Sequence, residues 1–263
     1  MLRANFPESF QVDTLKDIIT TAYPDTNFEM ELCDIEDTDW VTQVQSSWKP
    51  QVIDDLTIRF PWHDPDETET SLELVLEGGA AFGTGDHPTT RLCCRWLARN
   101  IEASKNMNVL DYGCGSAILG LAALRYGATS ADGTDIDLDA LISASRNCIN
   151  NNLTMDLYLA DDSELDEVQS IVMNQLRGSN SNVNFLPVSE IENKKYDLVV
   201  ANILAPILIS LAPQLAKHTK PGGKIALSGL VIQQKEVLIN RYSEFFDDVI
   251  LEESEDDWIL ITG

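Results

Sequence analysis

A short apolar stretch, residues 108–112, leads into a turn of the form Asp-x-Gly-Cys-Gly, and a helical pattern follows at once. Asp111 stands at the end of the apolar stretch, while Gly113 and Gly115 lie in the turn. Residues that lack a Cβ let the backbone approach a ligand closely, and a carboxylate beside them can lie near a ligand ammonium. The turn is therefore suited to a small molecule that carries an amino-acid group.

Two common glycine-rich sites do not fit this turn. The dinucleotide fingerprint Gly-x-Gly-x-x-Gly would need its third glycine at position 118, where the chain has Ile118. A phosphate-binding loop would need a lysine followed by Ser or Thr, and residues 111–117 contain no lysine. These differences argue against NAD or FAD and against a nucleotide phosphate in the turn.

Two further carboxylates follow the next predicted strand. Asp135 and Asp137 lie 24 and 26 residues beyond Asp111 (135 − 111 and 137 − 111). A carboxylate at the end of the second strand of a nucleotide-binding fold can accept hydrogen bonds from both ribose hydroxyls. A ligand with an amino-acid end and an adenosine end satisfies both signals, so we predict S-adenosylmethionine as the cofactor. The cofactor contacts predicted from these stretches are Asp111, Gly113, Gly115 and Asp135.

Two other stretches supply candidate site residues. A glycine-rich loop precedes a helical pattern whose first turn carries Thr89 and Thr90, hydroxyls that can cap backbone N–H groups or meet a ligand carboxylate. His87, in the same loop, could be a base or a structural residue. Asn202 ends an apolar stretch, and its side-chain carbonyl could accept a hydrogen bond from an amine and orient it for in-line attack on a methyl group. Asn202 is therefore the predicted catalytic residue.

The elements between these residues must bring them together. From residue 88 onward helical and strand patterns alternate, which implies right-handed crossovers and a mainly parallel sheet covered on both faces. The fold class is thus α/β, a doubly wound, mainly parallel seven-stranded sheet, in which the closing strand pair could supply one antiparallel strand. The predicted strands are 108–113, 129–136, 156–160, 195–203, 224–230, 248–253 and 257–263, and the predicted helices are 89–101, 118–127, 139–152, 206–219 and 233–246.

Composition limits the partners. The 263 residues include 18 basic and 43 acidic side chains, a net charge of −25 that repels phosphate backbones and attracts basic partners. We therefore expect a basic protein substrate and no direct nucleic-acid contact, although the charge could also serve general solubility. Five cysteines without Cys-x-x-Cys spacing predict a reducing compartment and no metal site. With no apolar stretch of the roughly 20 residues that a membrane span needs, and no secretory pattern at residues 1–10, we expect a cytoplasmic protein, with an organellar matrix as the alternative.

The motifs carry a family resemblance. Residues 81–90, 111–117, 135–138 and 200–204 resemble the patterns AFGTGxHxTT, DxGCGSG, DIDP and VANIL of the ribosomal protein L11 methyltransferase family, and residues 257–263 look like its C-terminus. The resemblance covers roughly residues 36–263. It implies a class I S-adenosylmethionine-dependent protein methyltransferase that acts on lysine ε-amines or an N-terminal α-amine, with a ribosomal protein as its partner. The cofactor contacts that it implies are Thr90, Gly113, Asp135 and Asn202.

The chain also departs from these patterns. Asp86 replaces the usual threonine, Ala117 the third glycine and Leu138 the proline that follows DID. Ala117 still has a small side chain, so the cofactor site is expected to persist. Asp132 and Thr134 are unusually polar for an interior strand.

The front of the chain differs more from the family. The family has a longer N-terminal substrate-recognition domain, and residues 12–35 are similar only to its second helix, here 12–23, and its last strand, here 27–35. We predict two domains: a shortened α+β substrate-recognition module with its linker, residues 1–58, and a methyltransferase domain, residues 59–263. Residues 48–62 and 71–79 read as strands joined by the polar stretch 63–70, and residues 161–185 read as a surface insertion.

Three other functions stay open at this point. The chain could methylate a small molecule, with the front module as a lid. It could methylate a different protein, since eukaryotic proteins similar to this family include one that acts on the β-subunit of electron transfer flavoprotein. It could also be a module that binds the cofactor without catalysis. The oligomeric state is not predicted.

Overall fold

The computed structural model describes residues 19–21, 48–64, 70–77, 85–159 and 184–263. The chain divides into two units, residues 1–44 and 45–263. The predicted boundary near residue 58 is therefore displaced, because Ile53, Leu56 and Ile58 are buried in the same hydrophobic core as Leu92 of the larger unit. In the first unit the structure describes a helical segment at 19–21, inside the helix predicted for 12–23, while the strand predicted for 27–35 lies outside the described residues.

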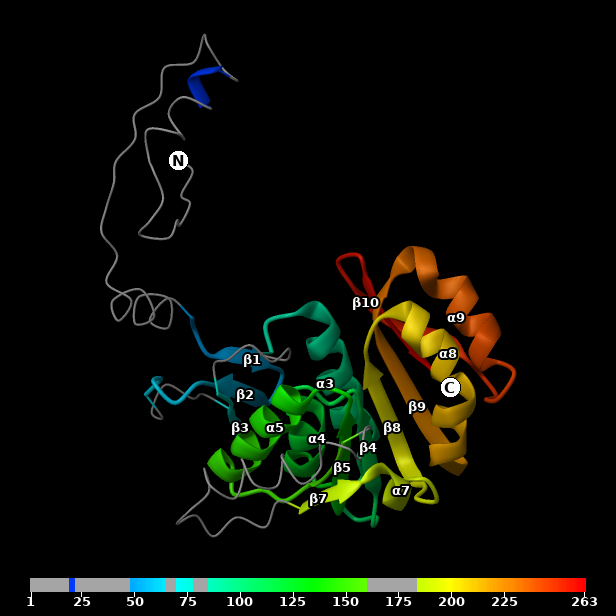
Figure 1. The fold of residues 1–263 in the computed structure, drawn as a ribbon, viewed down its shortest axis with the longest axis horizontal. Helices are drawn as coiled ribbons and strands as arrows, with labels where there is room; N and C mark the ends of the chain where they lie inside the picture. Colours follow the sequence, from blue (N-terminus) through cyan, green and yellow to red (C-terminus); the bar gives the residue numbers. More distant parts are fainter. Residues whose placement is uncertain (1–18, 22–47, 65–69, 78–84, 160–183) are drawn as a thin grey trace. The chain divides into compact units, whose positions relative to one another are not determined.

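A large, mostly parallel sheet forms the centre of the second unit (Figure 1). Its eight strands lie in the order β10, β11, β9, β8, β4, β5, β6, β7. Every neighbouring pair is parallel except those made by β11, which runs antiparallel to both β9 and β10, so the closing strand pair supplies the antiparallel strand as predicted. Along the chain the strands are β4 (Asn108–Tyr112), β5 (Ser130–Asp135), β6 (Asp156–Leu159), β7 (Asn184–Pro187), β8 (Tyr196–Asn202), β9 (Thr219–Val231), β10 (Ile250–Glu255) and β11 (Trp258–Thr262).

The fold class is confirmed; in the described residues the sheet has eight strands, one more than predicted. The additional strand is β7, which pairs in parallel with β6, with Phe185 opposite Leu157. It was missed because only four residues form it and a proline ends it, so it has no clear alternation of apolar and polar side chains. A one-turn helix, α7 (Val188–Ile191), follows it directly, and most of the predicted insertion, residues 161–183, lies outside the described residues.

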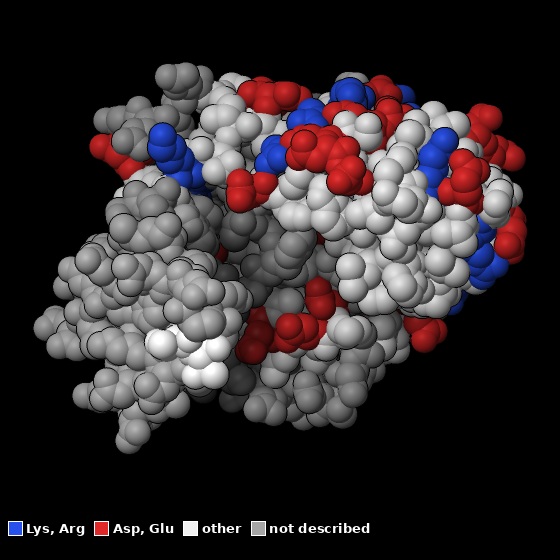
Figure 2. All heavy atoms as spheres, turned by 90° about the horizontal axis from the view of Figure 1, so that it is seen from above, with Lys and Arg blue, Asp and Glu red and all other residues white. Residues whose placement is uncertain are grey.

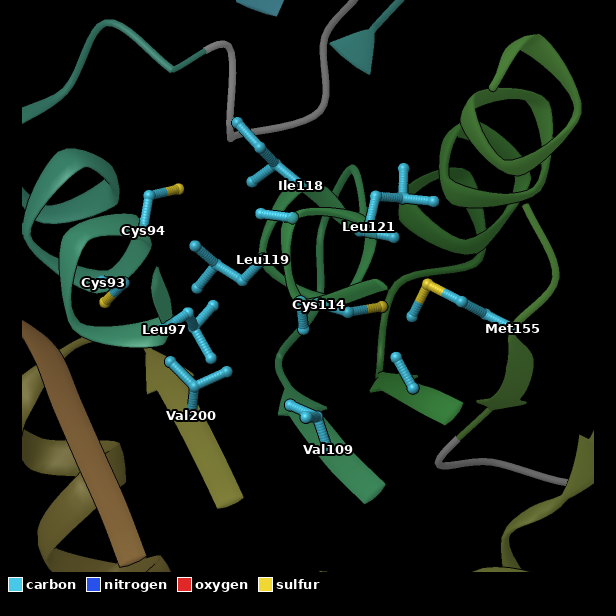
Figure 3. Close-up of a cluster of buried hydrophobic side chains, with 14 of the residues drawn as sticks. Cys93, Cys94, Leu97, Val109, Cys114, Ile118, Leu119, Leu121, Met155 and Val200 are labelled. Carbon is cyan, nitrogen blue, oxygen red and sulfur yellow. The ribbon is translucent and has the colours of Figure 1, made fainter. Parts of the chain in front are cut away.

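Helices cover both faces of the sheet. The helices are α3 (Pro88–Asn100), α4 (Ile118–Arg125), α5 (Leu138–Asn150), α8 (Ala205–His218) and α9 (Lys235–Tyr242), with a 3-10 turn at Ile232–Gln234. Side chains of α3, α4 and α5 share one core cluster, in which Leu97 and Leu119 meet Val109 and Val200 of the strands (Figure 3). Those of α8 and α9 belong to a second cluster. The two clusters agree with the predicted double winding.

A small three-stranded sheet precedes α3. The stretch 48–62, expected as one strand, turns back at Asp54, whose φ is 52°, and so forms two antiparallel strands, β1 (Gln51–Ile53) and β2 (Leu56–Arg59). The strand predicted for 71–79 is confirmed as β3 (Leu72–Val75), which pairs in parallel with β2.

Two buried asparagines, Asn147 of α5 and Asn151 at its C-cap, hold the end of β3 and the segment that follows it. Asn151 exchanges hydrogen bonds with the backbone of Val75, at 2.8 Å and 2.7 Å. Asn147 accepts from the N–H of Glu77 at 2.7 Å and donates to the carbonyl of Ser116 at 2.9 Å. Asn147 therefore joins the approach to the glycine-rich loop to the turn after β4.

The unusual polarity of β5 has a local explanation. The carboxylate of Asp132 receives the Lys194 ammonium at 3.0 Å and the Tyr196 hydroxyl at 2.7 Å. This buried carboxylate is thus paired and hydrogen-bonded, as burial of a charge requires.

Candidate active site

A cavity of about 660 Å³ opens at the carboxyl ends of the parallel strands, a volume within the range of small-molecule sites. Figure 2 looks onto this edge of the sheet and shows a hollow with carboxylates along its wall. All six predicted site residues line this one cavity: Thr90, Asp111, Gly113, Gly115, Asp135 and Asn202. The structure therefore brings together residues that are up to 112 positions apart in the chain (202 − 90).

The turn after β4 is held by backbone hydrogen bonds to β5. The N–H groups of Gly113 and Cys114 both donate to the carbonyl of Thr134, at 2.8 Å and 3.0 Å. Gly113 and Gly115 have φ values of 73° and 52°, in the left-handed region that glycine adopts with little strain. A Cβ on Gly113 would lie 2.5 Å from Cγ2 of Ile203, so the turn also requires a residue without a side chain there.

Ala117 shows why the missing third glycine does not disrupt the turn. It precedes α4 with a φ of 61°, the conformation that a glycine would adopt there. Its methyl group is fully buried in the core beneath the turn. The alanine thus keeps the backbone path of the motif, at a cost of about 1–2 kcal/mol for a Cβ in this conformation.

Three residues that line this cavity each carry a buried polar atom without a hydrogen-bond partner among the described residues. These atoms are Oγ1 of Thr90, Oδ1 of Asp111 and Oδ1 of Asn202. Thr90 and Asp111 are almost completely buried, with exposed fractions of 0% and 1%. Since burying an unsatisfied polar group costs about 1–3 kcal/mol, three such groups in one cavity indicate a polar ligand that pairs with them.

Burial also changes the acidity of Asp111. Its pKa is raised from 3.8 to about 8, chiefly because burial disfavours the charged carboxylate and further because Asp135 is near. The N–H of Gly120 donates to Oδ2 at 2.9 Å, which opposes the rise, while Oδ1 has no partner among the described residues. A cation placed beside Oδ1 would favour the ionised carboxylate.

Asp135 braces the glycine turn. Its Oδ2 accepts from the N–H of Gly115 at 2.8 Å, and its Oδ1 accepts from the N–H of Asp137 at 3.0 Å. Asp137 in turn caps α5 by accepting from the N–H of Asp139. Each carboxylate oxygen can accept more than one hydrogen bond, so Asp135 can hold the turn and still accept from a ligand hydroxyl.

His87 caps helix α3 with its ring. Its Nδ1 accepts from the N–H of Thr89 at 3.3 Å and lies 2.7 Å from the Thr89 hydroxyl. Thr89 is therefore engaged in capping, whereas the Thr90 hydroxyl has no hydrogen-bond partner among the described residues and Thr90 lines the cavity. The structural alternative for His87 is thus supported by this geometry, although its ring also lines the cavity.

Several cavity residues were not predicted from the sequence. Gly229 of β9 and Trp258 of β11 line the same cavity, as do Leu204 and Ile207 at the start of α8. Leu204 and Ile207 are 65% and 45% exposed, which is unusual for large apolar side chains and forms an apolar rim. Leu204 and Ile207 could have been predicted as cavity residues, because they closely follow Asn202 in the sequence. The sequence pattern around Trp258 predicts only a strand and gives no sign that this residue lines the cavity.

Comparison with known proteins decides the family. The family model described as Ribosomal protein L11 methyltransferase (PrmA) matches residues 1–263. The chain belongs to the ribosomal protein L11 methyltransferase family. The match extends over residues 1–35, beyond the range of the resemblance found in the motifs. It is thus a methyltransferase, and S-adenosylmethionine is its methyl donor, as predicted.

Individual relatives agree. The chain is 36% identical over 267 residues to the ribosomal protein L11 methyltransferase of Methylobacillus flagellatus, covering all of this chain and 79% of that protein. It is 41% identical over 230 residues to the one of Neisseria meningitidis, covering 87% and 67%. The crystal structure of the ribosomal protein L11 methylase from Lactobacillus delbrueckii subsp. bulgaricus superimposes with a TM-score of 0.64 at 26% identity, covering 82% of this chain and 97% of that one.

The residues present fit this cofactor. Its ammonium and sulfonium are cationic, and Asp111 and Asp135 line the cavity beside the exposed backbone of the turn. Among the described residues, no cluster of His, Cys, Asp and Glu side chains could hold a metal ion. No helix in the described part of the chain is long and apolar enough to cross a bilayer.

We expect cofactor affinity to rise about tenfold per pH unit from about pH 6 toward about pH 8. Below pH 8 Asp111 is largely protonated, so binding of a cation beside it must release one proton. The stability of the free protein should change with pH in the opposite direction. The pKa of Asp111 is higher in the folded than in the unfolded protein, so its contribution to the free energy of unfolding falls as pH rises from about 4 to about 8.

The variant Asp111→Asn should weaken cofactor binding. It should also remove the pH dependence of cofactor affinity and the Asp111 contribution to the pH dependence of the unfolding free energy. Calorimetric titrations with S-adenosylmethionine and thermal unfolding of the free protein, each at several pH values, measure them. If the variant kept the wild-type pH dependence of affinity, another group would be responsible.

Proposed function

We propose that this protein transfers methyl groups from S-adenosylmethionine to lysine ε-amines, or the N-terminal α-amine, of ribosomal protein L11. The observation that carries the proposal is that three residues lining one cavity, Thr90, Asp111 and Asn202, each have a buried oxygen without a partner in the described part of the chain, in a member of this family. The relatives' names support ribosomal protein L11 over a small molecule or a flavoprotein as the substrate.

In this proposal the cavity has a cofactor end beside β4 and β5. Asp111 and the glycine turn hold the amino-acid group, Thr90 meets the carboxylate and Asp135 accepts from the ribose hydroxyls. When bound, S-adenosylmethionine supplies a methyl group on a sulfonium, which an amine can displace. The protein's own task is to hold the amine in line with that methyl group.

Asn202 performs this task at the end of β8. Its Oδ1 is buried and unpaired among the described residues, so it can accept a hydrogen bond from the incoming amine and aim the nitrogen lone pair. The amine must be neutral, which for lysine at pH 7 costs about 4.6 kcal/mol (3.4 pKa units at 1.36). The apolar rim of Leu204 and Ile207 lowers this cost, because desolvation disfavours the charged ammonium.

Asp135→Ala should weaken cofactor binding in two ways. It removes the proposed ribose acceptor, and it leaves the N–H of Gly115 without its partner. Asp135→Asn keeps one acceptor oxygen for that N–H, so its affinity should lie between those of the alanine variant and the wild type. Isothermal titration calorimetry measures this order; an alanine variant with wild-type affinity would exclude the ribose role.

The acidic surface supports a basic partner. The net charge of −25 favours a lysine-rich protein over a nucleic acid. We propose that the reaction takes place in the cytoplasm.

The test uses tritiated S-adenosylmethionine and a matched cell extract separated into ribosomes, other proteins and small molecules, with Asp135→Ala as the control enzyme. We expect label in one ribosomal protein band. Label in a single non-ribosomal protein would replace the substrate and keep the chemistry. No label above that of the control enzyme would contradict the proposed function.

A further inference from the structure

The order of the strands in the sheet gives the order of the residues along the cavity. Along the sheet, Asp135 ends β5, Gly113 follows β4, Asn202 ends β8, Gly229 lies in β9 and Trp258 begins β11. Because β11 runs antiparallel to β9, its first residue, Trp258, lies opposite Val231 at the carboxyl end of β9. With the ribose at Asp135 and the amine at Asn202, the end under β9 and β11 is left for the acceptor side chain.

Two aromatic rings form the wall at this acceptor end. His87, the cap of α3, and Trp258 pack edge to face, with ring centroids 4.6 Å apart and an interplanar angle of 70°. Both line the cavity. An indole offers an apolar surface on which the alkyl stem of a lysine can pack while its nitrogen reaches further in. The position of Trp258 therefore governs how an acceptor enters.

Trp258 is fixed through a tight hairpin. In the register of β10 and β11, Glu255 stands directly opposite Trp258, and Asp256 and Asp257 form the turn between them. Asp256 has a φ of 53°, as such two-residue turns require. Whatever holds Glu255 in place thus holds the cross-strand Trp258 as well.

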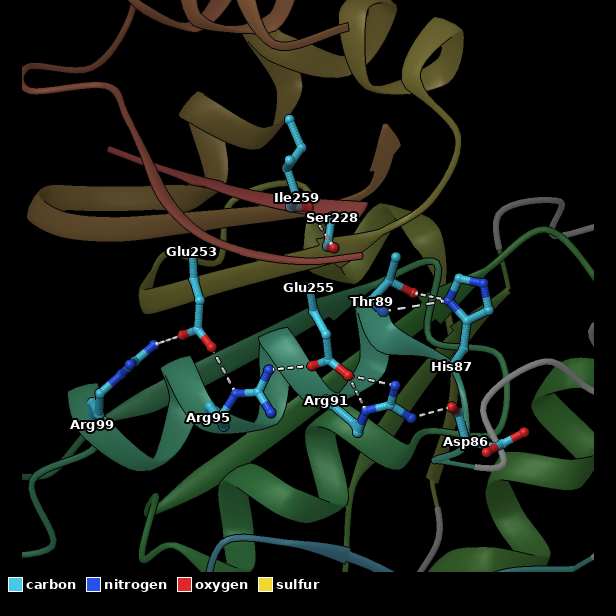
Figure 4. Close-up of polar contacts among 10 residues, drawn as sticks. All are labelled: Asp86, His87, Thr89, Arg91, Arg95, Arg99, Ser228, Glu253, Glu255 and Ile259. Atoms are coloured by element: carbon cyan, nitrogen blue, oxygen red, sulfur yellow. Dashed lines mark hydrogen bonds and ion pairs between the residues drawn. The ribbon is translucent and has the colours of Figure 1, made fainter. Parts of the chain in front are cut away.

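A row of ion pairs fastens Glu255 to helix α3 (Figure 4). Glu255 accepts from Nε of Arg91 at 2.7 Å and also pairs with Nη2 of Arg95. Glu253 accepts from Nε of Arg95 at 2.8 Å and pairs with Nη2 of Arg99 at 2.6 Å. The three arginines are spaced four residues apart and so face the same way on the helix. We call these five residues the arginine ladder.

The ladder is more than a set of exposed pairs. The side chains of Arg91, Arg95 and Glu255 are only 21–26% exposed, and Glu255 is shared between two guanidinium groups. Burial acts to raise the pKa of Glu255, yet hydrogen bonds from Arg91 and Arg95 bring it below its usual value. Arg91 also donates to the carbonyl of Asp86, beside the cap His87. The arginine ladder therefore holds both the strand that pairs with Trp258 and the residue that precedes His87.

We propose that Glu255 is a positioning residue for the acceptor: through Arg91 and Arg95 it holds Trp258 against His87 and so shapes the end of the cavity that the acceptor lysine enters. The proposal rests on the proposed function, which identifies the acceptor. It assigns Glu255 no contact with the cofactor, because Glu255 is not among the described residues that line the cavity.

The test is a double-variant cycle on the full chain with purified ribosomal protein L11. Glu255→Gln should raise KM for that substrate about tenfold, with kcat and the affinity for S-adenosylmethionine within about twofold of wild type. Trp258→Ala should raise KM by a similar factor. If Glu255 acts through Trp258, the double variant should show no further rise. Binding of ribosomal protein L11 in the presence of S-adenosylhomocysteine, by calorimetry, should follow the same order without turnover.

Glu252→Gln is the matched control, because Glu252 is an exposed carboxylate on the same strand outside the ladder. It should behave as wild type. A wild-type KM for Glu255→Gln, or KM effects that multiply in the double variant, would overturn the positioning role. A wild-type enzyme that fails to methylate ribosomal protein L11 would instead overturn the proposed function, so the two failures are distinguishable.

Discussion

Replacing Asn202 with alanine is expected to lower kcat roughly 100-fold, the scale on which misplacing a reactant slows an enzyme. The affinity for S-adenosylmethionine should change far less. Oδ1 of Asn202 is buried and has no hydrogen-bond partner among the described residues, and Asn202 lines the cavity. Without it the amine loses the contact that aims its lone pair. Single-turnover rates and calorimetric affinities separate the two effects.

Asn202→Asp is the informative companion variant. It keeps the size and one acceptor oxygen but adds a negative charge, which favours the ammonium over the neutral amine. Its rate should be low near neutral pH and should continue to rise up to a higher pH than that of the wild type, because the carboxylate raises the pKa of the amine. Equal losses of methyl transfer and cofactor affinity in the alanine variant would contradict the catalytic role of Asn202.

Gly113→Ala is expected to have the second large effect. A non-glycine residue at a φ of 73° costs about 1–2 kcal/mol, and the new Cβ would meet Cγ2 of Ile203 at 2.5 Å, an overpacking that adds about 1–3 kcal/mol. Ile203 follows Asn202, so its displacement should disturb both ends of the cavity. Cofactor affinity should fall at least about tenfold, which corresponds to 1.4 kcal/mol of this strain acting on the bound state.

Gly222→Ala controls for the backbone strain alone. Gly222 has a φ of 75°, yet no atom lies within 4 Å of the position of its Cβ. This variant should lose about 1–2 kcal/mol of unfolding free energy and keep wild-type cofactor affinity. Thermal unfolding and calorimetry on both variants make the comparison. If Gly222→Ala lost as much affinity as Gly113→Ala, the contact with Ile203 would not explain the effect.

Most of the fold followed from hydrophobic periodicity. The alternation of helical and strand patterns after residue 88 predicts the α/β sheet correctly, because each buried strand and each amphipathic helix has its own period. Strand β7 was not predicted, because its four residues end in a proline and show no clear alternation of apolar and polar side chains. The boundary near residue 58 was displaced because the apolar residues of β1 and β2 do not reveal which core they enter.

The site could be located from the sequence, but its internal contacts could not. Residues at the ends of neighbouring parallel strands must meet, which is why Asp111, Asp135 and Asn202 line one cavity. The pairing of Glu255 with Arg91 joins residues 164 positions apart and depends on the packing of α3 against the last hairpin. No local pattern carries such information.

The most direct test of the central claim uses the purified protein, S-adenosylmethionine and purified ribosomal protein L11, with Asn202→Ala in parallel. Intact-mass spectrometry counts the methyl groups added, and peptide mapping assigns them to residues. We expect methyl groups on lysine side chains or the N-terminal amine of ribosomal protein L11 with the wild type, and a far slower appearance with the variant. No methylation of ribosomal protein L11 by a folded, cofactor-binding wild type would contradict the assignment.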